Sequence, residues 1–347
     1  MAEINQNRKT MTNIKSVSAD YAAVRDRGAG LIDLSSRGRI LISGSEAAMF
    51  LNGLITNDVK TLSVGSWMPA AFANVQGRLL AVIRVLHRED GFLIDTEAQT
   101  RQTVLGLVER FTMAGDFKVA DLTSNASSFS VQGPGAREIV EHVLGAAVAQ
   151  IERESIVGTE VNGTPASVIR ATHTAEDGFD LFADVQVAEA LRDRLTTAGV
   201  TVVSADVAET LRIEAGIPRY GIDMDETTVV TETNLDDTVS FTKGCYTGQE
   251  IIVRIRHRGH VAKKLAGLVV EGQVPIEHHA KILSSDGNEI GRVTSSTFSP
   301  AVERAIALGY VKYDYLSPGT KVRVFSGSAE FSGTVADLPF VRGSWYE

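Results

Sequence analysis

The chain has very little cysteine: Cys245 is the single one among 347 residues. One thiol excludes a disulfide within the chain, and it excludes zinc or iron–sulfur motifs rich in cysteine. No apolar run approaches the ~20 residues that cross a bilayer. The first 20 residues are polar and lack the apolar core of a signal peptide. We therefore expect a soluble, cytoplasmic protein with no membrane partner.

Basic residues are outnumbered as well. The 34 Lys and Arg stand against 43 Asp and Glu, which gives a net charge of −9 and argues against non-specific coating of nucleic acid. Three sequence signatures are also missing: a Walker-type loop, a Gly-x-Gly-x-x-Gly turn between strand and helix, and a Gly-x-Ser-x-Gly turn. Nucleotide kinases, Rossmann dehydrogenases and α/β-hydrolases therefore lose support.

The composition that is present, 44% apolar and 22% charged, is that of an ordinary globular protein. Residues 1–18 are polar and aperiodic, which predicts a flexible tail. Residues 19–262 mix strand pairs with helices, which favours two interleaved α+β lobes over repeated βαβ units. Residues 263–347 hold short β-type runs separated by Gly, Pro, Asp and Asn, which predicts a small antiparallel barrel.

Hydrophobic periodicity predicts individual elements within residues 19–262. The first clear strand, 38–44, is followed by helical spacing, with Ser45 as the expected N-cap of that helix. The other expected strands are a pair within 69–86 that turns near 76–77, then 92–95, 128–131 and 166–169; further helices are expected at 99–111, 135–144 and 187–198.

The most unusual segment is FTKGCYTGQE, residues 241–250. Thr247 and Glu250 have the spacing of a capping box, which predicts a helix start there. Cys245 would then precede a helix N-terminus and lie beside Lys243, and both features favour thiolate over thiol. Cys245 and Lys243 are therefore the catalytic candidates. A lone cysteine is also often a small buried hydrophobic residue, so a structural role stays open.

A basic run follows, from Arg254 to Lys264. It suits a polyanion such as a phosphate, an RNA segment or a multi-carboxylate tail, or else it is a solvated helix face. The nearby histidines match no zinc spacing, and we expect no metal site. Further upstream, Glu176 lies in a predicted turn, where its carboxylate could accept two parallel N–H bonds from a pterin edge or serve only as turn chemistry.

Residues 243–250, KGCYTGQE, resemble the signature of YgfZ-type folate-binding proteins, which are relatives of the glycine cleavage T protein, an aminomethyltransferase. The resemblance implies a three-lobed aminomethyltransferase-like fold with a central folate-sized channel and a C-terminal antiparallel β-barrel. The supporting matches are DLS (33–35), FLNGLITNDV (50–59), NVQGR (74–78), QGP (132–134), EDGF (176–179), LRIEAGIP (211–218), IGRVTS (290–295) and LPF (338–340).

The same resemblance implies tetrahydrofolate, or a one-carbon or polyglutamylated derivative, as the ligand. It assigns Glu176 to the position that holds the pterin in aminomethyltransferases. The folate tail is expected to run towards Arg254, near Cys245. The full set of expected folate-binding residues is Glu176, Gln132, Tyr246, Gln249, Arg212 and Arg254.

One departure bears on the reaction. Aminomethyltransferases carry an aspartate in the strand after the Asn-x-x-Gly turn, where it handles the proton on the reacting folate nitrogen. Ala81 and Val82 stand at the matching positions here. Neither side chain can move a proton, and general acid–base help is typically worth ~10²–10⁴-fold. This loss argues against aminomethyl transfer.

The expected function is therefore that of a folate-binding accessory protein in iron–sulfur cluster assembly or repair, with an indirect effect on tRNA modification. Its expected partners are the folate and iron–sulfur assembly or client proteins, and it is expected to be a monomer. A tetrahydrofolate-dependent aminomethyl or one-carbon transferase is the alternative. A third hypothesis is a folate-independent module that binds RNA or a protein through residues 254–264.

Overall fold

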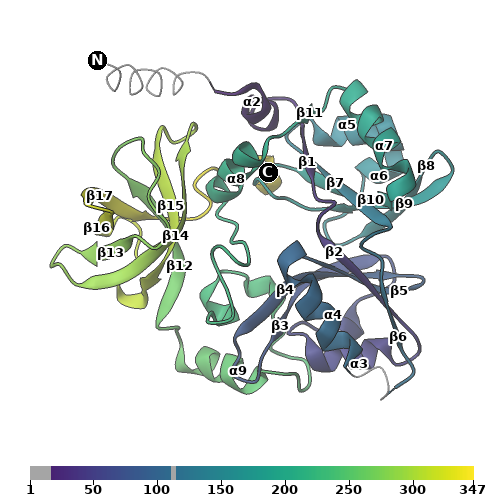
Figure 1. Cartoon of the computed structure of the whole chain (residues 1–347), viewed down its shortest axis with the longest axis horizontal. Helices are drawn as coiled ribbons and strands as arrows, with labels where there is room; N and C mark the ends of the chain where they lie inside the picture. Colours follow the sequence, from purple (N-terminus) through teal and green to yellow (C-terminus); the bar gives the residue numbers. More distant parts are fainter. Residues whose placement is uncertain (1–16, 111–114) are drawn as a thin grey trace.

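The computed structural model describes residues 17–110 and 115–347. Figure 1 shows three units around a common centre: two sheets with their helices, and a β-barrel. This arrangement confirms the predicted three-lobed α+β fold with an antiparallel C-terminal barrel. Residues 1–16 of the expected tail, and residue 111 of one expected helix, lie outside the described residues.

Sheet A has six strands in the order β11-β1-β7-β10-β9-β8. Its neighbouring strands are antiparallel except β1 and β11, which run parallel. The strands are β1 (Gly30–Asp33), β7 (Ala126–Gln132), β8 (Ile156–Val161), β9 (Thr164–Arg170), β10 (Gly178–Asp184) and β11 (Thr201–Val202).

Sheet B has five antiparallel strands in the order β3-β4-β5-β2-β6. The chain leaves sheet A after β1, builds all of sheet B, and returns to sheet A with β7. The strands are β2 (Gly38–Ser43), β3 (Ser66–Ala73), β4 (Leu79–Arg88), β5 (Gly91–Thr96) and β6 (Lys118–Asp121). The predicted hairpin within 69–86 is confirmed as β3 and β4.

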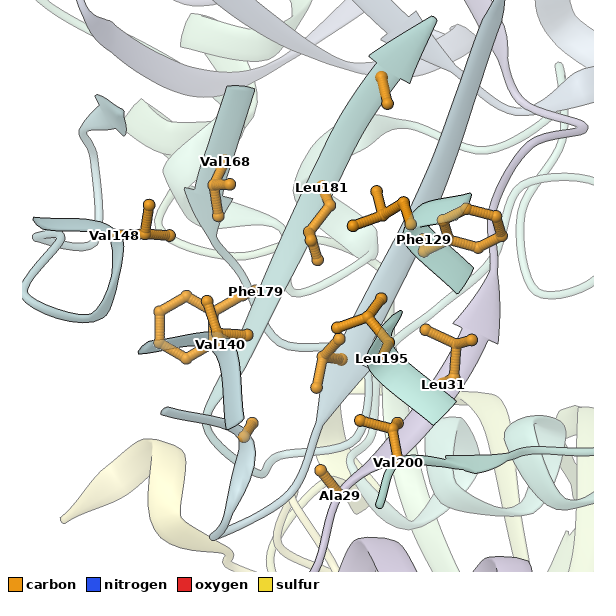
Figure 2. Packing of buried hydrophobic residues seen from close by; sticks show 14 of the residues in the cluster. Ala29, Leu31, Phe129, Val140, Val148, Val168, Phe179, Leu181, Leu195 and Val200 are labelled. Atoms are coloured by element: carbon orange, nitrogen blue, oxygen red, sulfur yellow. The ribbon is translucent and has the colours of Figure 1, made fainter. Parts of the chain in front are cut away.

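The two sheets lie face to face, with helices on their outer sides. Helices α5 (Ala136–Leu144) and α7 (Val185–Thr197) cover sheet A, while α3 (Ala47–Leu54) and α4 (Arg101–Glu109) cover sheet B. Figure 2 shows this packing on sheet A, where Leu181 of β10 lies among side chains from strands and helices. Because side chains alternate along a strand, the neighbours of Leu181 on β10 point towards sheet B.

The barrel is a closed ring of six strands in the order β12-β15-β14-β13-β16-β17. Closure leaves no unpaired strand edge in this unit. The strands are β12 (Lys263–Val270), β13 (Lys281–Ser284), β14 (Glu289–Ser299), β15 (Arg304–Lys312), β16 (Lys321–Ser326) and β17 (Ala329–Ala336).

Three segments join the barrel to the two sheets. Helix α8 (Ala205–Glu214) packs against β14 and β15, and α9 (Gln249–Arg258) precedes β12. The last ten residues, 338–347, are called here the C-terminal strap, because they leave the barrel and return to sheet A. The remaining helices are α2 (Ala19–Arg25) and α6 (Ala146–Ala149). Within 17–110 and 115–347, no helix is long and apolar enough to cross a membrane.

Two predicted helix starts are wrong. The N-cap of α3 is Glu46, and the Ser45 hydroxyl donates instead to Asp116, at 2.6 Å. The capping box at 247–250 does not form, because α9 begins at Gln249 after Gly248, whose φ is +85°. The Glu250 carboxylate instead accepts from Arg254 one turn along the helix, at 2.7 Å. Both predictions rested on local capping residues, whereas packing fixes the direction of the chain where each helix begins.

Candidate functional site

A row of charged side chains crosses the inner face of sheet B. Asp95 on β5 pairs in register with Arg39 on β2 and with Arg84 on β4. Both arginines form ion pairs with the Asp95 carboxylate, and Nε of Arg37 donates to it at 2.9 Å. Asp95 is fully buried. Three guanidinium groups therefore converge on one carboxylate between the sheets.

Sheet A contributes the second carboxylate of this cluster. Asp180 on β10 is fully buried and forms an ion pair with Nη1 of Arg84. The His173 ring, in the loop between β9 and β10, places Nε2 at 3.1 and 2.9 Å from the two Asp180 oxygens. The ion pair of Arg84 with Asp180 thus bridges the two sheets. We call Arg37, Arg39, Arg84, Asp95, Asp180 and His173 the inter-sheet cluster.

The cluster keeps both carboxylates ionised. Burial alone would raise the pKa of Asp95, but the three guanidinium groups hold it well below its usual range. Burial would likewise raise the pKa of Asp180, and His173 with Arg84 lowers it well below that of a free aspartate. Burial lowers the pKa of Arg39 to about 10, and the neighbouring Arg37 and Arg84 act in the same direction against the attraction of Asp95.

An aromatic cluster lies beside Arg84. Val82 occupies the same face of β4 as Arg84, two residues earlier. It packs, as Tyr220 and Phe241 do, against a hydrophobic cluster that contains Tyr246. The Tyr246 side chain is buried, and its hydroxyl has no hydrogen-bond partner among the residues that the structure describes. Burial raises the pKa of Tyr246 to about 12, so this phenol stays protonated at neutral pH.

A cavity of about 900 Å³ opens at another part of the inter-sheet interface. Arg39 and Phe182 line it, together with residues of the β4–β5 hairpin. None of the residues expected from the sequence to bind folate lines this cavity.

Two profiles of known families match the chain. The first, described as GCVT N-terminal domain, matches residues 5–243, and the second, described as glycine cleavage T-protein C-terminal barrel domain, matches residues 263–342. The chain belongs to the glycine cleavage T-protein family. A T-protein relative named aminomethyltransferase, from Rubrobacter xylanophilus, is 34% identical over 296 residues, which are 85% of this chain and 79% of the relative.

Two further T-protein comparisons agree. An aminomethyltransferase from Geobacillus kaustophilus is 29% identical and covers 94% of this chain and 91% of its own. The crystal structure of glycine cleavage system aminomethyltransferase T from Bartonella henselae has the same fold, with a TM-score of 0.85 at 24% identity over 93% of this chain and 89% of that chain. These relatives support the superfamily rather than its YgfZ-type branch.

The comparisons overturn the expected function. Relatives named aminomethyltransferase extend over nearly the whole chain, so the expectation of an accessory protein in iron–sulfur cluster assembly, acting on tRNA modification, is wrong. That expectation rested on the resemblance of residues 243–250 to YgfZ-type proteins and on the loss of the strand acid at Ala81 and Val82. The identity of a single side chain bears on one chemical step. The similarity to the T-proteins extends over 296 aligned residues and therefore carries more weight.

The two residues predicted to be catalytic lie in different surroundings. Cys245 is exposed, just before α9. Nζ of Lys243 is buried and donates to the backbone carbonyls of Asn52, Ile55 and Asn57, at 2.7 to 2.9 Å. Burial lowers the pKa of Lys243 to about 8. Its contacts tie two segments of backbone together, and the catalytic roles of both residues stay predictions.

Glu176, the predicted pterin carboxylate, is engaged by the protein itself. It is 3% exposed and accepts from Nη1 of Arg25, at 2.8 Å. Its second oxygen accepts from the backbone N–H and the hydroxyl of Ser344 in the C-terminal strap, both at 2.8 Å. Gly343 packs so closely that a Cβ there would meet the carboxylate at 2.3 Å. In this conformation Glu176 anchors the strap.

Gln132 and Arg212 are also used internally. The Gln132 amide donates to Ser130 and Ala171 and accepts from the His173 backbone, so it holds the β9–β10 loop. Arg212 pairs with Glu209 and Asp223 beneath the barrel. Both side chains thus hold the framework together, and their folate-binding roles stay predictions.

The other predicted ligands differ in what they leave free. Gln249 contacts the carbonyls of Lys243 and Gly244 at 3.4 Å, and Arg254 is exposed with Glu250 as its partner. Tyr246 alone among the predicted set is buried with a polar atom that lacks a partner in the described part of the chain.

The inter-sheet cluster was missed from the sequence, although a signal was present. Arg84 interrupts the apolar run LLAVIRVL, Asp95 ends FLID, and Asp180 interrupts GFDLF. A charge within an apolar strand is seldom buried unless it is paired. The three charges could therefore have been recognised as members of buried ion pairs. The sequence does not show which of them pair with each other.

Proposed function

We propose that this T-protein relative is a tetrahydrofolate-dependent aminomethyl or related one-carbon transferase. The observation that carries the proposal is the similarity to aminomethyltransferases, at up to 34% identity, over both family domains. Aminomethyltransferases of this family use tetrahydrofolate, which supplies the nitrogen atoms that receive the one-carbon unit. The geometry adds a buried polar and aromatic centre beside β4.

Tetrahydrofolate fits the residues at this centre. The orphaned hydroxyl of Tyr246 offers one donor, and an unpaired buried hydroxyl costs about 1–3 kcal/mol unless a ligand satisfies it. The half-buried ring of Tyr220 and the side chain of Val82 add apolar surface to the same cluster. Tyr246 would therefore bind the folate, with Tyr220 and Val82 packing against it.

We expect Tyr246→Phe to weaken tetrahydrofolate binding about tenfold, which corresponds to about 1.4 kcal/mol. The substitution removes a hydroxyl that makes no bond to the described protein, so the free energy of unfolding should stay equal or rise. Isothermal titration of tetrahydrofolate and urea denaturation measure the two quantities. Tyr315→Phe, on a half-buried barrel tyrosine, is the matched control and should change neither.

The activity itself is measured with purified protein, tetrahydrofolate and an aminomethylated carrier protein. Formation of methylene-tetrahydrofolate is the expected result. The proposal is contradicted if the protein forms no product and also gives no heat of binding at millimolar tetrahydrofolate. Binding without product would leave a folate-binding protein and rule out the transferase.

A further inference from the structure

The cavity of about 900 Å³ between the two sheets has apolar walls and a buried positive charge. Leu93 and Phe182 line it and belong to the hydrophobic cluster between the sheets, and Ile156 packs against that cluster. Arg39 also lines the cavity and is only 2% exposed. Small-molecule sites typically have volumes of ~300–1,000 Å³, with apolar walls and a few polar groups that orient the ligand. The cavity therefore has the size and the composition of a ligand site.

The protein satisfies only part of the Arg39 guanidinium. Nη1 forms an ion pair with Asp95 and donates to the carbonyl of Gly38, while Nη2 donates to the hydroxyl of Ser128. Nε is buried and has no hydrogen-bond partner among the residues that the structure describes. A buried donor of a charged group is costly when it lacks a partner. An acceptor bound in the cavity that Arg39 lines would remove that cost.

The positive charge of Arg39 is also under-compensated. Asp95 is its carboxylate partner, and Asp95 is shared with Arg37 and Arg84. Burial lowers the pKa of Arg39 to about 10, and the two neighbouring guanidinium groups add to this effect against the attraction of Asp95. A further anion near Arg39 would act in the opposite direction. The electrostatics therefore favour a negatively charged ligand.

The acidic residues of the lining do not cancel this preference. Glu89 and Asp90 are exposed, and the Asp90 carboxylate pairs with Arg88 at 2.8 Å. Asp184 accepts from the backbone N–H of Gln186 at the start of α7, also at 2.8 Å. Water and salt screen exposed charges, whereas a buried guanidinium acts through a lower dielectric. The buried part of the cavity is therefore positive.

A glycine marks free space in the wall that sheet A contributes. Gly158 of β8 pairs in register with Ser167 of β9, which pairs with Phe182 of β10, so these positions share one face of the sheet. All three line the cavity. A Cβ added at Gly158 would have no atom of the described chain within 4 Å. Glycine inside a strand often marks the close approach of another backbone or a ligand, and here no backbone approaches.

We propose that this cavity is a second ligand site, which binds a small organic carboxylate with an apolar body. A carboxylate oxygen accepts from Nε of Arg39, and the apolar body lies against Phe182 and passes over Gly158. An inorganic anion would leave the apolar walls in contact with water, so the apolar body contributes to binding. The site goes beyond the proposed function and is separate from the folate centre, because neither Tyr246 nor Val82 lines the cavity.

The probe is 4-phenylbutyrate, titrated calorimetrically into the purified full-length protein. We expect a Kd of about 1 mM or lower. The neutral amide of the same acid should bind at least about tenfold more weakly, because it cannot compensate the charge of Arg39. Inorganic phosphate should also bind at least about tenfold more weakly, because it has no apolar body. Acid and amide that bind equally well, or phosphate that binds as well as the acid, would overturn the proposal.

Two variants locate the binding. Gly158→Phe fills the cavity and should weaken 4-phenylbutyrate binding at least about tenfold, with the tetrahydrofolate Kd changed less than about threefold. The matched control is Gly106→Phe on α4, an exposed glycine outside the cavity whose added Cβ also meets no atom within 4 Å. It should keep both affinities. Arg39→Gln should abolish the preference for the acid over the amide. If Arg39→Gln fails to fold, Gly158→Phe decides alone, because it leaves the inter-sheet cluster intact.

The remaining outcomes separate this inference from the proposed function. Absence of any heat at about 10 mM 4-phenylbutyrate, or unchanged affinity in Gly158→Phe, overturns the inference alone. Loss of tetrahydrofolate binding in Gly158→Phe makes the cavity the folate site, which overturns the claim of a second site. A protein that binds 4-phenylbutyrate as expected but makes no methylene-tetrahydrofolate supports the inference and contradicts only the transferase.

Discussion

Lys243 illustrates how a single residue can have the expected type and a different role. Three backbone carbonyls accept from its ammonium group, from the end of α3 and the segment that follows it. The ammonium group also lies over the aromatic ring of Tyr246, with Nζ 4.9 Å from the ring centroid. The lysine therefore joins residues 52–57 to the segment before α9, which positions Tyr246.

We expect Lys243→Met to cost about 3 kcal/mol in the free energy of unfolding. The methionine fills similar volume but leaves three carbonyls without their donor, and an unsatisfied buried group costs about 1–3 kcal/mol. Urea denaturation measures this cost. Cys245→Ala, two residues away and exposed, should stay within about 0.5 kcal/mol of wild type. Equal stability of all three proteins would contradict the structural role of Lys243.

At the scale of elements, the start of α9 depends on a close approach to the β3–β4 turn. Gly248 is the N-cap of α9 with φ +85°, and a Cβ there would lie 2.5 Å from the carbonyl oxygen of Asn74. A position that has a left-handed backbone conformation and touches another backbone segment has room only for glycine. The turn of the β3–β4 hairpin and α9 therefore fix each other's positions.

We expect Gly248→Ala to destabilise the protein by about 3 kcal/mol, of which the unfavourable φ accounts for about 1–2 kcal/mol. The remainder is the displacement of the 74–77 turn. Gly259→Ala, at the other end of α9, is the matched control, since its φ is +95° but no atom lies within 4 Å of the added Cβ. Thermal and urea unfolding of both variants compare strain alone with strain plus contact, and equal losses would rule out the contact.

The C-terminal strap is a second element whose position depends on distant partners. Ser344 bonds Glu176, and the ring of Trp345 lies under the guanidinium groups of Arg153 and Arg170, at 4.3 and 5.3 Å. These contacts fasten the end of the barrel unit to sheet A. Glu176, which the sequence suggested as a folate ligand, therefore anchors the C-terminal strap to sheet A in this conformation.

At the scale of the whole molecule, the inter-sheet cluster is the polar centre of a helix–sheet–sheet–helix arrangement. Removing one partner of a buried ion pair costs about 3–5 kcal/mol, because the other charge is left uncompensated. Arg84 joins the sheets through ion pairs, since it pairs with Asp95 in its own sheet and with Asp180 in the other.

Acid should therefore unfold the two-sheet unit before the barrel. The pKa values of Asp95 and Asp180 are lowered in the folded state, so their stabilisation is complete above the unfolded value near 4 and is lost as the pH falls below it. The Trp67 ring, 6.0 Å from the Arg84 guanidinium, reports on this unit by fluorescence. Hydrogen exchange below pH 4 should show sheets A and B opening while the barrel stays protected.

The control for this acid transition is Asp90→Asn, which removes an exposed partner of Arg88. It should leave the transition unchanged, because exposed pairs contribute little. Asp95→Asn should lower stability at neutral pH and make it less sensitive to acid between pH 4 and 2. Simultaneous opening of sheets and barrel in the wild type would contradict the proposed order.

Local patterns in the sequence were enough to predict many of the elements and the superfamily. Alternating apolar residues around the glycine turn at 76–77 specified the β3–β4 hairpin, and short punctuated runs after residue 263 specified the barrel. These features depend on neighbours within a few residues, so periodicity and turn residues suffice to predict them.

Which side chains meet depends on how the elements pack together. Arg84 and Asp180 are 96 residues apart, and Glu176 and Ser344 are 168 residues apart. Each belongs to a strand or turn that was predictable, but the facing of two sheets and the return of the strap bring them together. Since one buried carboxylate serves equally well as ligand, anchor or ion-pair partner, its role is set by what packs against it.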